Sequence, residues 1–285
     1  MKILFPTDFS KPAEKAFIYA LKVADRMQGE ILTVHSYELP RISPRHLPNT
    51  LSDIYNSIQL EEFENFKNEI PTLRNIARAH QLGHVKVTNV LEEGKPLSTI
   101  IRVARKENAD LIIMGTKGAT GLREIFLGSV TGEVMEKAPC PVLGIPLNAE
   151  FDGVLNVFAV TTDFSQEDAV ALKQVSQFAG IFGAEVRCIH FDVLHQEKLI
   201  HQLSQWKEEL DFDISHIHFE VIDTSHLENS MVEYIDKHEV DIVAMLIHKR
   251  GFFEEMFNYS LAKKMAYHLY TPILALPAAV LVSVN

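Results

Sequence analysis

Glycines and a serine are spaced along the chain as the backbone of a phosphate-binding loop would require. Gly115 and Gly118 follow an apolar run, and after nine further residues Gly128 and Ser129 stand directly before a helical pattern. Glycine allows positive φ and lets backbone N–H groups approach an anion without a Cβ in the way. A helix beginning here would turn its free N–H groups and its positive dipole end toward the same anion. The Ser129 hydroxyl would add one donor. We call these four residues the phosphate cradle.

The alternative is a glycine-rich turn followed by an ordinary serine cap, because glycine and serine are common turn residues. The context favours the cradle, since the motif follows a strand pattern, spans a loop and closes on a helix start. Neither a P-loop pattern nor G-x-G-x-x-G occurs in the chain. The fingerprints of P-loop NTPases and of dinucleotide-binding enzymes are therefore absent.

Other positions could complete a nucleotide site. Asp8 ends the first strand pattern, and its carboxylate could accept hydrogen bonds from an adenine amine or a ribose hydroxyl. A turn or capping role is the alternative for this aspartate. The backbone around Ser36, at the end of the second strand pattern, could contact an adenine edge. Lys117 and Arg123 could neutralise phosphate charge, or they are solvated loop cations.

These residues lie at the ends of strand patterns that alternate with helical patterns. Short apolar or alternating runs predict strands at residues 2–5, 30–36, 85–91, 111–114 and 142–145. Apolar residues at helical spacing predict helices at residues 10–29, 51–80, 98–107 and 129–137. In the first of these helices Ser10 is the expected N-cap and Gly29 the expected stop signal. We expect a break in the second near Pro71.

Strands that alternate with helices predict a parallel sheet with helices on both faces, which right-handed crossovers make doubly wound. The fold class is thus α/β and Rossmann-like, with the strand order 3-2-1-4-5. Ligands of such sheets bind beyond the carboxyl ends of the strands, in the crevice where the strand order reverses. That crevice lies between the first and fourth strands. Asp8 and the phosphate cradle should face each other across it.

The chain repeats this pattern in its second half. The segment Phe5–Ser10 reappears as Val160–Ser165, and Ala138–Pro146 resembles Leu269–Pro277. A repeat of this kind predicts tandem copies of one structural unit.

We therefore expect two tandem five-stranded domains, at residues 1–147 and 152–280, joined by a short polar link. The last strands of the two copies are expected to pair edge to edge, as a pseudo-dimer within one chain. The apolar tail Ala278–Val284 could extend that contact or serve a second chain in a homodimer.

Composition narrows the class of protein. The formal net charge of −11 argues against a sequence-independent nucleic-acid binder, which needs a basic field to neutralise phosphates. Cys140 and Cys188 lack CxxC spacing and are expected as buried thiols of a reducing compartment. The longest apolar stretch, Pro272–Val284, falls short of the roughly 20 residues of a membrane helix. Because the N-terminal apolar run is also too short for a signal peptide, we expect a cytoplasmic protein with no membrane contact.

Taken together, these motifs resemble the universal stress protein family. The resemblance is carried by the glycine spacing, by Pro6–Asp8 and by Ala138–Val142, and it covers both copies, as in a tandem member. It implies ATP binding, with the strand-one aspartate and the second-strand backbone holding adenosine and the cradle holding the phosphates. The contacts that the resemblance implies are Pro6, Thr7, Asp8, Ser36, Met114, Gly115, Gly118, Gly128, Ser129 and Val130.

The second copy departs from the cradle pattern. When the two copies are aligned without gaps, the cradle glycines Gly115, Gly118 and Gly128 are replaced by Leu246, Lys249 and Tyr259. Asp8 and Ser129 keep identical counterparts, Asp163 and Ser260. Leu246 and Tyr259 should resist the positive φ that glycine allows, so we expect no ATP in this copy. It is then a packing partner, or it holds a different anion through His248, Lys249 and Arg250.

Histidines of the second copy do not reach the spacing of a metal site. His216 and His218 share a predicted strand face, and His195 and His201 lie on a predicted helix nearby, with no third ligand evident. Trp206, at helical spacing with other apolar residues, is expected in the core or between the copies.

Three functions stay open on the sequence alone. The favoured one is an ATP-binding protein of stress response or signalling, because nothing resembles a positioned general base, an arginine finger or a nucleophilic triad. Slow ATP hydrolysis or self-phosphorylation is the most that we expect, since a bound triphosphate with Mg²⁺ needs little more. The alternatives are an ATP-using enzyme of a related α/β fold and a structural interaction module. The sequence does not distinguish ATP from ADP, AMP or a cyclic nucleotide.

Overall fold

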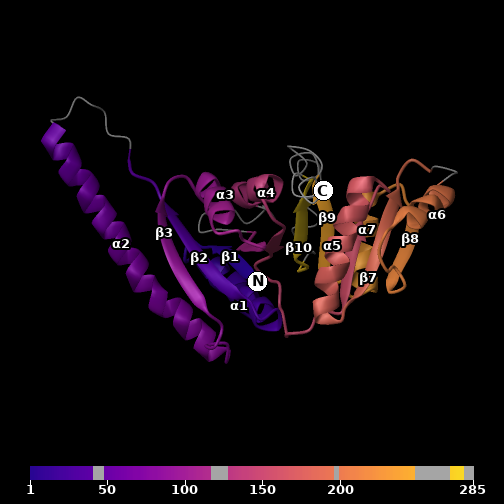
Figure 1. The fold of residues 1–285 in the computed structure, drawn as a ribbon, viewed down its shortest axis with the longest axis horizontal. Coiled ribbons are helices and arrows are strands. Elements are labelled where there is room, and N and C mark those ends of the chain that lie inside the picture. The colour runs from indigo at the N-terminus through magenta and orange to yellow at the C-terminus, as the bar shows by residue number, and fades with distance from the viewer. Residues whose placement is uncertain (41–47, 117–127, 196–198, 248–269, 279–285) are drawn as a thin grey trace.

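The computed structural model describes residues 1–40, 48–116, 128–195, 199–247 and 270–278, whose strands form one ten-stranded sheet (Figure 1). The strands are β1 (Lys2–Pro6), β2 (Glu30–Tyr37), β3 (Val87–Glu93), β4 (Leu111–Gly115), β5 (Val142–Ile145), β6 (Val157–Thr161), β7 (Glu185–Asp192), β8 (Ile217–Asp223), β9 (Ile242–Ile247) and β10 (Ile273–Pro277). The helices of the described part are α1 (Lys11–Arg26), α2 (Pro48–Ala79), α3 (Pro96–Lys106), α4 (Ser129–Lys137), α5 (Gln166–Phe182), α6 (Leu199–Glu209) and α7 (Leu227–Lys237).

The order of the strands repeats between the two halves. From edge to edge it reads β3-β2-β1-β4-β5-β10-β9-β6-β7-β8. Counted from its own outer edge, each half therefore has the strand order 3-2-1-4-5. Neighbours within each run pair in parallel, whereas β5 and β10 pair antiparallel. The predicted fold class and the predicted pairing of the two last strands are confirmed. Because β5 and β10 run in opposite directions, the strand ends of the two halves point opposite ways where the halves meet.

Helices cover both faces of the sheet. Alternate side chains of β4 point to opposite faces, so Ile113 packs with α1 and α2 while Ile112 packs with α3 and α4. In the second half Leu172 of α5 and Trp206 of α6 belong to the first of these clusters, and Met231 of α7 belongs to the second. Each apolar cluster contains residues of both halves. One core therefore runs along each face of the whole sheet.

The first helix begins as predicted and ends differently. Ser10 is the N-cap of α1, and its hydroxyl accepts a hydrogen bond from the Ala13 N–H at 3.4 Å. The left-handed residue after the helix is Gln28, with φ 49°, and not the glycine that follows it. Gly29 provides space instead, because a Cβ there would stand 2.9 Å from the Met1 carbonyl oxygen. The glycine stop signal thus lies at the right place for a different physical reason.

Other boundaries of the first half also differ from the sequence expectation. The helix α2 runs unbroken through Pro71, which is exposed, so the carbonyl left unpaired by the proline can be solvated. The strand β3 begins two residues late, since the Val85 N–H turns back to the Leu82 carbonyl oxygen at 3.1 Å. The second half is shorter mainly because α6 has 11 residues where α2 has 32.

Candidate functional site

The strand order of the first half reverses between β1 and β4. β1 pairs with β2 on one side and with β4 on the other, with Leu4 opposite Ile112. Continued past the strand ends, this register brings Thr7 beside Gly115. Reversal points of this kind are where open parallel sheets bind ligands. The predicted residues after β1 and at the end of β4 therefore come together at one edge of the sheet.

A tight turn follows β1 and fixes the direction of Asp8. Phe9 is left-handed, with φ 57°, and its N–H donates to Thr7 Oγ1 at 3.0 Å. The Asp8 Oδ1 accepts hydrogen bonds from the N–H and the hydroxyl of Ser10, at 3.1 and 2.6 Å. The side chain is exposed to solvent. Asp8 therefore stabilises the turn, which is the role that the sequence offered as the alternative to ligand binding. The same turn holds its carboxylate at the end of β1.

The structure adds His35, to which the sequence pattern assigned no role. Its Nδ1 lies 2.8 Å from the Thr7 carbonyl oxygen, and because a carbonyl only accepts, Nδ1 carries the proton. The ring stacks on Phe66 of α2, with 17° between the planes. The repeat contained a signal for this residue, since His190 contacts the Thr162 carbonyl oxygen in the same way at 2.7 Å.

The described ends of the phosphate cradle are tied to each other by two hydrogen bonds. The Gly128 N–H donates to the Thr116 carbonyl oxygen at 2.7 Å. The Thr131 hydroxyl donates to the Gly115 carbonyl oxygen at 3.0 Å. The start of α4 is therefore held against the end of β4. Three predicted residues of the intervening loop lie outside the described residues: Lys117, Gly118 and Arg123.

The two described glycines of the cradle, Gly115 and Gly128, do not use the positive φ that glycine allows. Gly128 has φ −65° and ψ 150°, Gly115 is the last residue of β4, and neither is among the residues with positive φ. Gly128 provides space instead, because a Cβ there would stand 3.2 Å from the Thr116 carbonyl oxygen. The close approach of one backbone segment to another accounts for Gly128.

The helix α4 begins without a side-chain cap, because its N-cap residue is Gly128. The first N–H groups of an α-helix have no acceptor within the helix, and in α4 they belong to Ser129, Val130 and Thr131. Ser129 is exposed and Val130 is half-buried at this end. The amides and the helix dipole together make a positive end that suits an anion.

The remaining predicted contacts lie at the same strand ends. Pro6 and Met114 are buried, and Met114 packs in the core beside α3 and α4. Ser36 is half-buried near the end of β2, opposite Glu92 of β3. A ligand in the crevice would therefore meet the main chain of these residues.

The second half keeps the turn but not the cradle glycine. Its Phe164 is also left-handed, with φ 63°, and donates its N–H to Thr162 Oγ1 at 2.9 Å. Ala159 lies opposite Val243 as Leu4 lies opposite Ile112, which puts Leu246 in the place of Gly115. Leu246 is 5% exposed and packs in the core. Five residues named for this crevice lie outside the described part: His248, Lys249, Arg250, Tyr259 and Ser260.

The strand β7 ends on a carboxylate where its counterpart β2 ends on a tyrosine. Asp192 ends β7 at the position that Tyr37 holds in β2, and it is 6% exposed. Its Oδ1 accepts a hydrogen bond from the Leu194 N–H at 3.1 Å.

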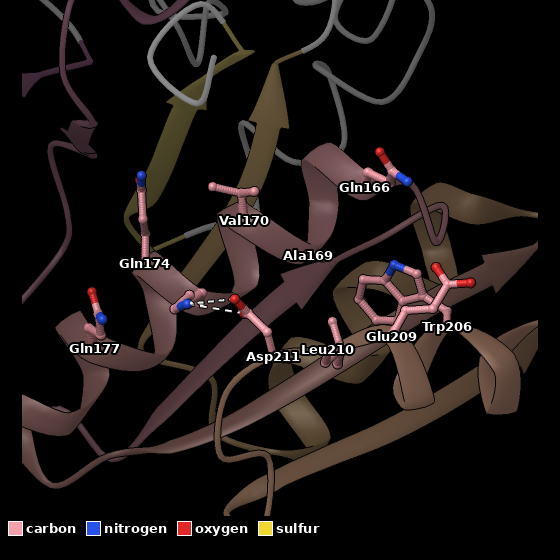
Figure 2. A pocket seen from close by; sticks show the side chains of 10 residues that line it. Gln166, Ala169, Val170, Gln174, Gln177, Trp206, Glu209, Leu210 and Asp211 are labelled. Atoms are coloured by element: carbon pink, nitrogen blue, oxygen red, sulfur yellow. Dashed lines mark hydrogen bonds and ion pairs between the residues drawn. The ribbon is translucent and has the colours of Figure 1, made fainter. Parts of the chain in front are cut away.

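A groove of about 530 Å³ opens between α5 and α6 of the second half (Figure 2). Trp206 and Leu210 line its apolar side, and Lys173 contacts Asp211 at 3.0 Å. Trp206 is 4% exposed and donates its indole N–H to the Ser165 carbonyl oxygen at 2.8 Å, so its predicted core position is confirmed. The groove lies along these helices and not between the ends of β6 and β9.

No three side chains of His, Cys, Asp or Glu in the described residues are grouped so that they could share a metal ion. His216 bonds to the Ser176 hydroxyl at 2.7 Å, and His195 pairs with Asp223. His195 precedes α6 in a left-handed conformation, with φ 53°, so its predicted helical position is wrong. Over the described part of the chain, none of the helices is at once long and apolar enough to cross a bilayer.

Comparison with known proteins identifies relatives of the first half. Residues 1–146 match the Universal stress protein family. A universal stress protein of Methanocaldococcus jannaschii is 35% identical over 149 residues, which cover 50% of this chain and 92% of that protein. One of Thermus aquaticus is 33% identical over 141 residues, covering 50% of this chain and 95% of that protein.

A similar fold extends over both halves. The crystal structure of a universal stress protein from Archaeoglobus fulgidus has a TM-score of 0.72 and covers 97% of this chain and 98% of that chain, at 19% identity. At that identity the likeness concerns the fold alone. The family match over residues 1–146, with relatives above 30% identity, shows that this chain belongs to the universal stress protein family.

Proposed function

We propose that the first half binds an adenine nucleotide, with ATP favoured, and that the protein acts in a stress response or in signalling. The observation that carries the proposal is the uncapped start of α4, which is tied to the end of β4 beside the turn of Asp8. Backbone amides at a helix start and a carboxylate across a reversal crevice suit the two ends of a nucleotide. The family resemblance supports the same ligand.

The proposed roles follow from the family resemblance and, for the described residues, from their positions at the strand ends. Asp8 accepts hydrogen bonds from the adenosine part, and the main chain at Ser36 contacts the adenine edge. Pro6, Thr7 and Met114 line the crevice between these groups and the phosphates. The phosphates, with their Mg²⁺, lie against Gly115, Gly118, Gly128, Ser129 and Val130.

We further propose two domains, at residues 1–147 and 152–280, of which only the first holds a nucleotide. A packed leucine replaces the strand-end glycine in the second, so a side chain stands where the first has only backbone.

The test combines mass spectrometry of ligand released from the purified protein with titration of ATP. The wild-type chain should release or bind an adenine nucleotide. Gly115→Leu, which copies Leu246 onto the first half, should lower the ATP affinity at least tenfold because it adds a bulky side chain at a strand end where the proposal places the phosphates against bare backbone. The matched control is Gly180→Leu in α5, where an added Cβ meets nothing within 4 Å. It should bind ATP as the wild type does.

Unchanged ATP affinity in Gly115→Leu would overturn the site assignment. An ATP turnover assay on the wild type separates a binding protein from an ATP-using enzyme. The absence of any adenine-nucleotide binding would leave the structural interaction module as the better account.

A further inference from the structure

Thr131 makes an unusual connection for a residue in the first turn of a helix. It is the third residue of α4 and is 4% exposed. Its hydroxyl donates out of the helix to the Gly115 carbonyl oxygen, at 3.0 Å. A serine or threonine near a helix start more often bonds within its own first turn. Here the hydroxyl joins the helix to the strand that precedes it.

A second bond works in parallel with this one. The Gly128 N–H donates to the Thr116 carbonyl oxygen at 2.7 Å, and Thr116 is itself 1% exposed. The two bonds connect residues 115–116 at the end of β4 with residues 128–131 at the start of α4. The chain therefore leaves β4 and enters α4 at nearly the same place. The bonds set the distance between the end of β4 and the first amides of α4.

This distance matters for any anion that both elements hold. Donors that already stand at the right separation lose less conformational freedom when the ligand binds. A bond that fixes the separation therefore raises affinity without touching the ligand. The chain offers an internal comparison, since the position aligned with Thr131 two residues after Ser260 is Ala262, which has no hydroxyl.

We propose that Thr131 is a positioning residue for the phosphate groups of the nucleotide. The inference rests on the proposed function. Thr131 acts through the Gly115 carbonyl, and its own hydroxyl does not contact the ligand. Its effect should therefore depend on how many phosphates the ligand carries.

The test compares ATP with adenosine, which has no phosphate, in calorimetric titrations of the full chain. Thr131→Val keeps the shape of the side chain and removes the donor. It should weaken ATP binding about fivefold, the effect of one ordinary hydrogen bond, and leave the adenosine affinity unchanged. Thr131→Ser restores the hydroxyl and should recover most of the ATP affinity.

The matched control is Thr271→Val. Thr271 is 9% exposed and donates its hydroxyl to the Val240 carbonyl oxygen at 3.4 Å in the second half. The same chemical change there should leave both affinities as in the wild type.

The possible outcomes separate this inference from the function on which it rests. Failure of the wild type to bind ATP overturns both. ATP binding that Thr131→Val leaves unchanged overturns the positioning role alone. An equal loss of ATP and adenosine affinity, or a Thr131→Ser variant as weak as Thr131→Val, shows that the residue only supports the fold and also overturns the role.

Discussion

Asp8 and Asp163 occupy the same turn in the two halves and are held there by different partners. In the first half Ser10 donates its N–H and hydroxyl to Asp8. In the second half the Ser165 N–H donates to Asp168 at 3.1 Å instead, and Asp163 lies 3.5 Å from His190. The turn is therefore a feature of the fold, and its presence alone does not mark a nucleotide site. The difference between the halves lies across the crevice, where Leu246 replaces Gly115.

The two thiols give a prediction at the same scale. Cys140 and Cys188 are 4% and 1% exposed. Burial raises the pKa of Cys140 to about 12, and it also raises the pKa of the Cys188 thiol. Because the thiolate is the reactive form, neither should react with Ellman's reagent at pH 8 in the folded protein. Two equivalents should react in denaturant.

Rapid modification of either thiol in the native chain would contradict that prediction. It would show that the cysteine is exposed in solution, which the burial of both residues excludes. The unfolded protein serves as the control, since it measures the total number of thiols under the same reagent.

At the scale of elements, α5 depends on a capping box that α1 lacks. Asp168 is 4% exposed, and its Oδ2 accepts hydrogen bonds from the N–H groups of Asp163 and Ser165 at 2.9 and 3.1 Å. Asp168→Ala removes both bonds and should lower the free energy of unfolding by about 1–2 kcal/mol. Urea denaturation followed by circular dichroism measures this change.

The neighbouring Glu167 provides the control. It is exposed in the same turn of α5, and Glu167→Ala should change the free energy of unfolding by less than about 0.5 kcal/mol. Equal effects of the two substitutions would mean that charge near the helix start, and not the capping box, stabilises α5.

The sequence predicted the elements well because apolar periodicity follows from burial. The strand β4 and the helix α4 were predicted within one residue, since β4 is a continuous apolar run and the apolar residues of α4 recur at helical spacing. The hydrogen bonds of His35 and Thr131 were not predicted. The bond of His35 reaches a carbonyl 28 residues away and that of Thr131 a carbonyl 16 residues away. Contacts between such distant residues do not appear in the periodicity of apolar residues along the sequence.

The conformation of Gly128 could not be predicted from the sequence for a related reason. Glycine is compatible with positive φ and with close backbone approach, and residue type alone does not distinguish the two. At Gly128 the approach of the Thr116 carbonyl decides, and that contact exists only in the folded chain.

At the scale of the whole molecule, the two halves share their apolar clusters and one sheet. Leu274 of β10 is 3% exposed and lies opposite Leu143 of β5 across the antiparallel pair. We therefore expect a single cooperative unfolding transition in calorimetry. Leu274→Ala should lower stability by about 2–4 kcal/mol and shift that one transition as a whole.

Leu194→Ala is the control for this expectation. Leu194 is 73% exposed, so its truncation should change stability by less than about 0.5 kcal/mol. Two separate transitions, with only one of them moved by Leu274→Ala, would show that the halves unfold independently.

The number of nucleotides bound per chain tests the central claim most directly. Equilibrium dialysis with labelled ATP should give one nucleotide per chain for the wild type, because Leu246 stands in the second half where the first half has Gly115 at the end of its fourth strand. The value should fall to zero in Gly115→Leu. A wild-type value of zero, or of two, would contradict the account.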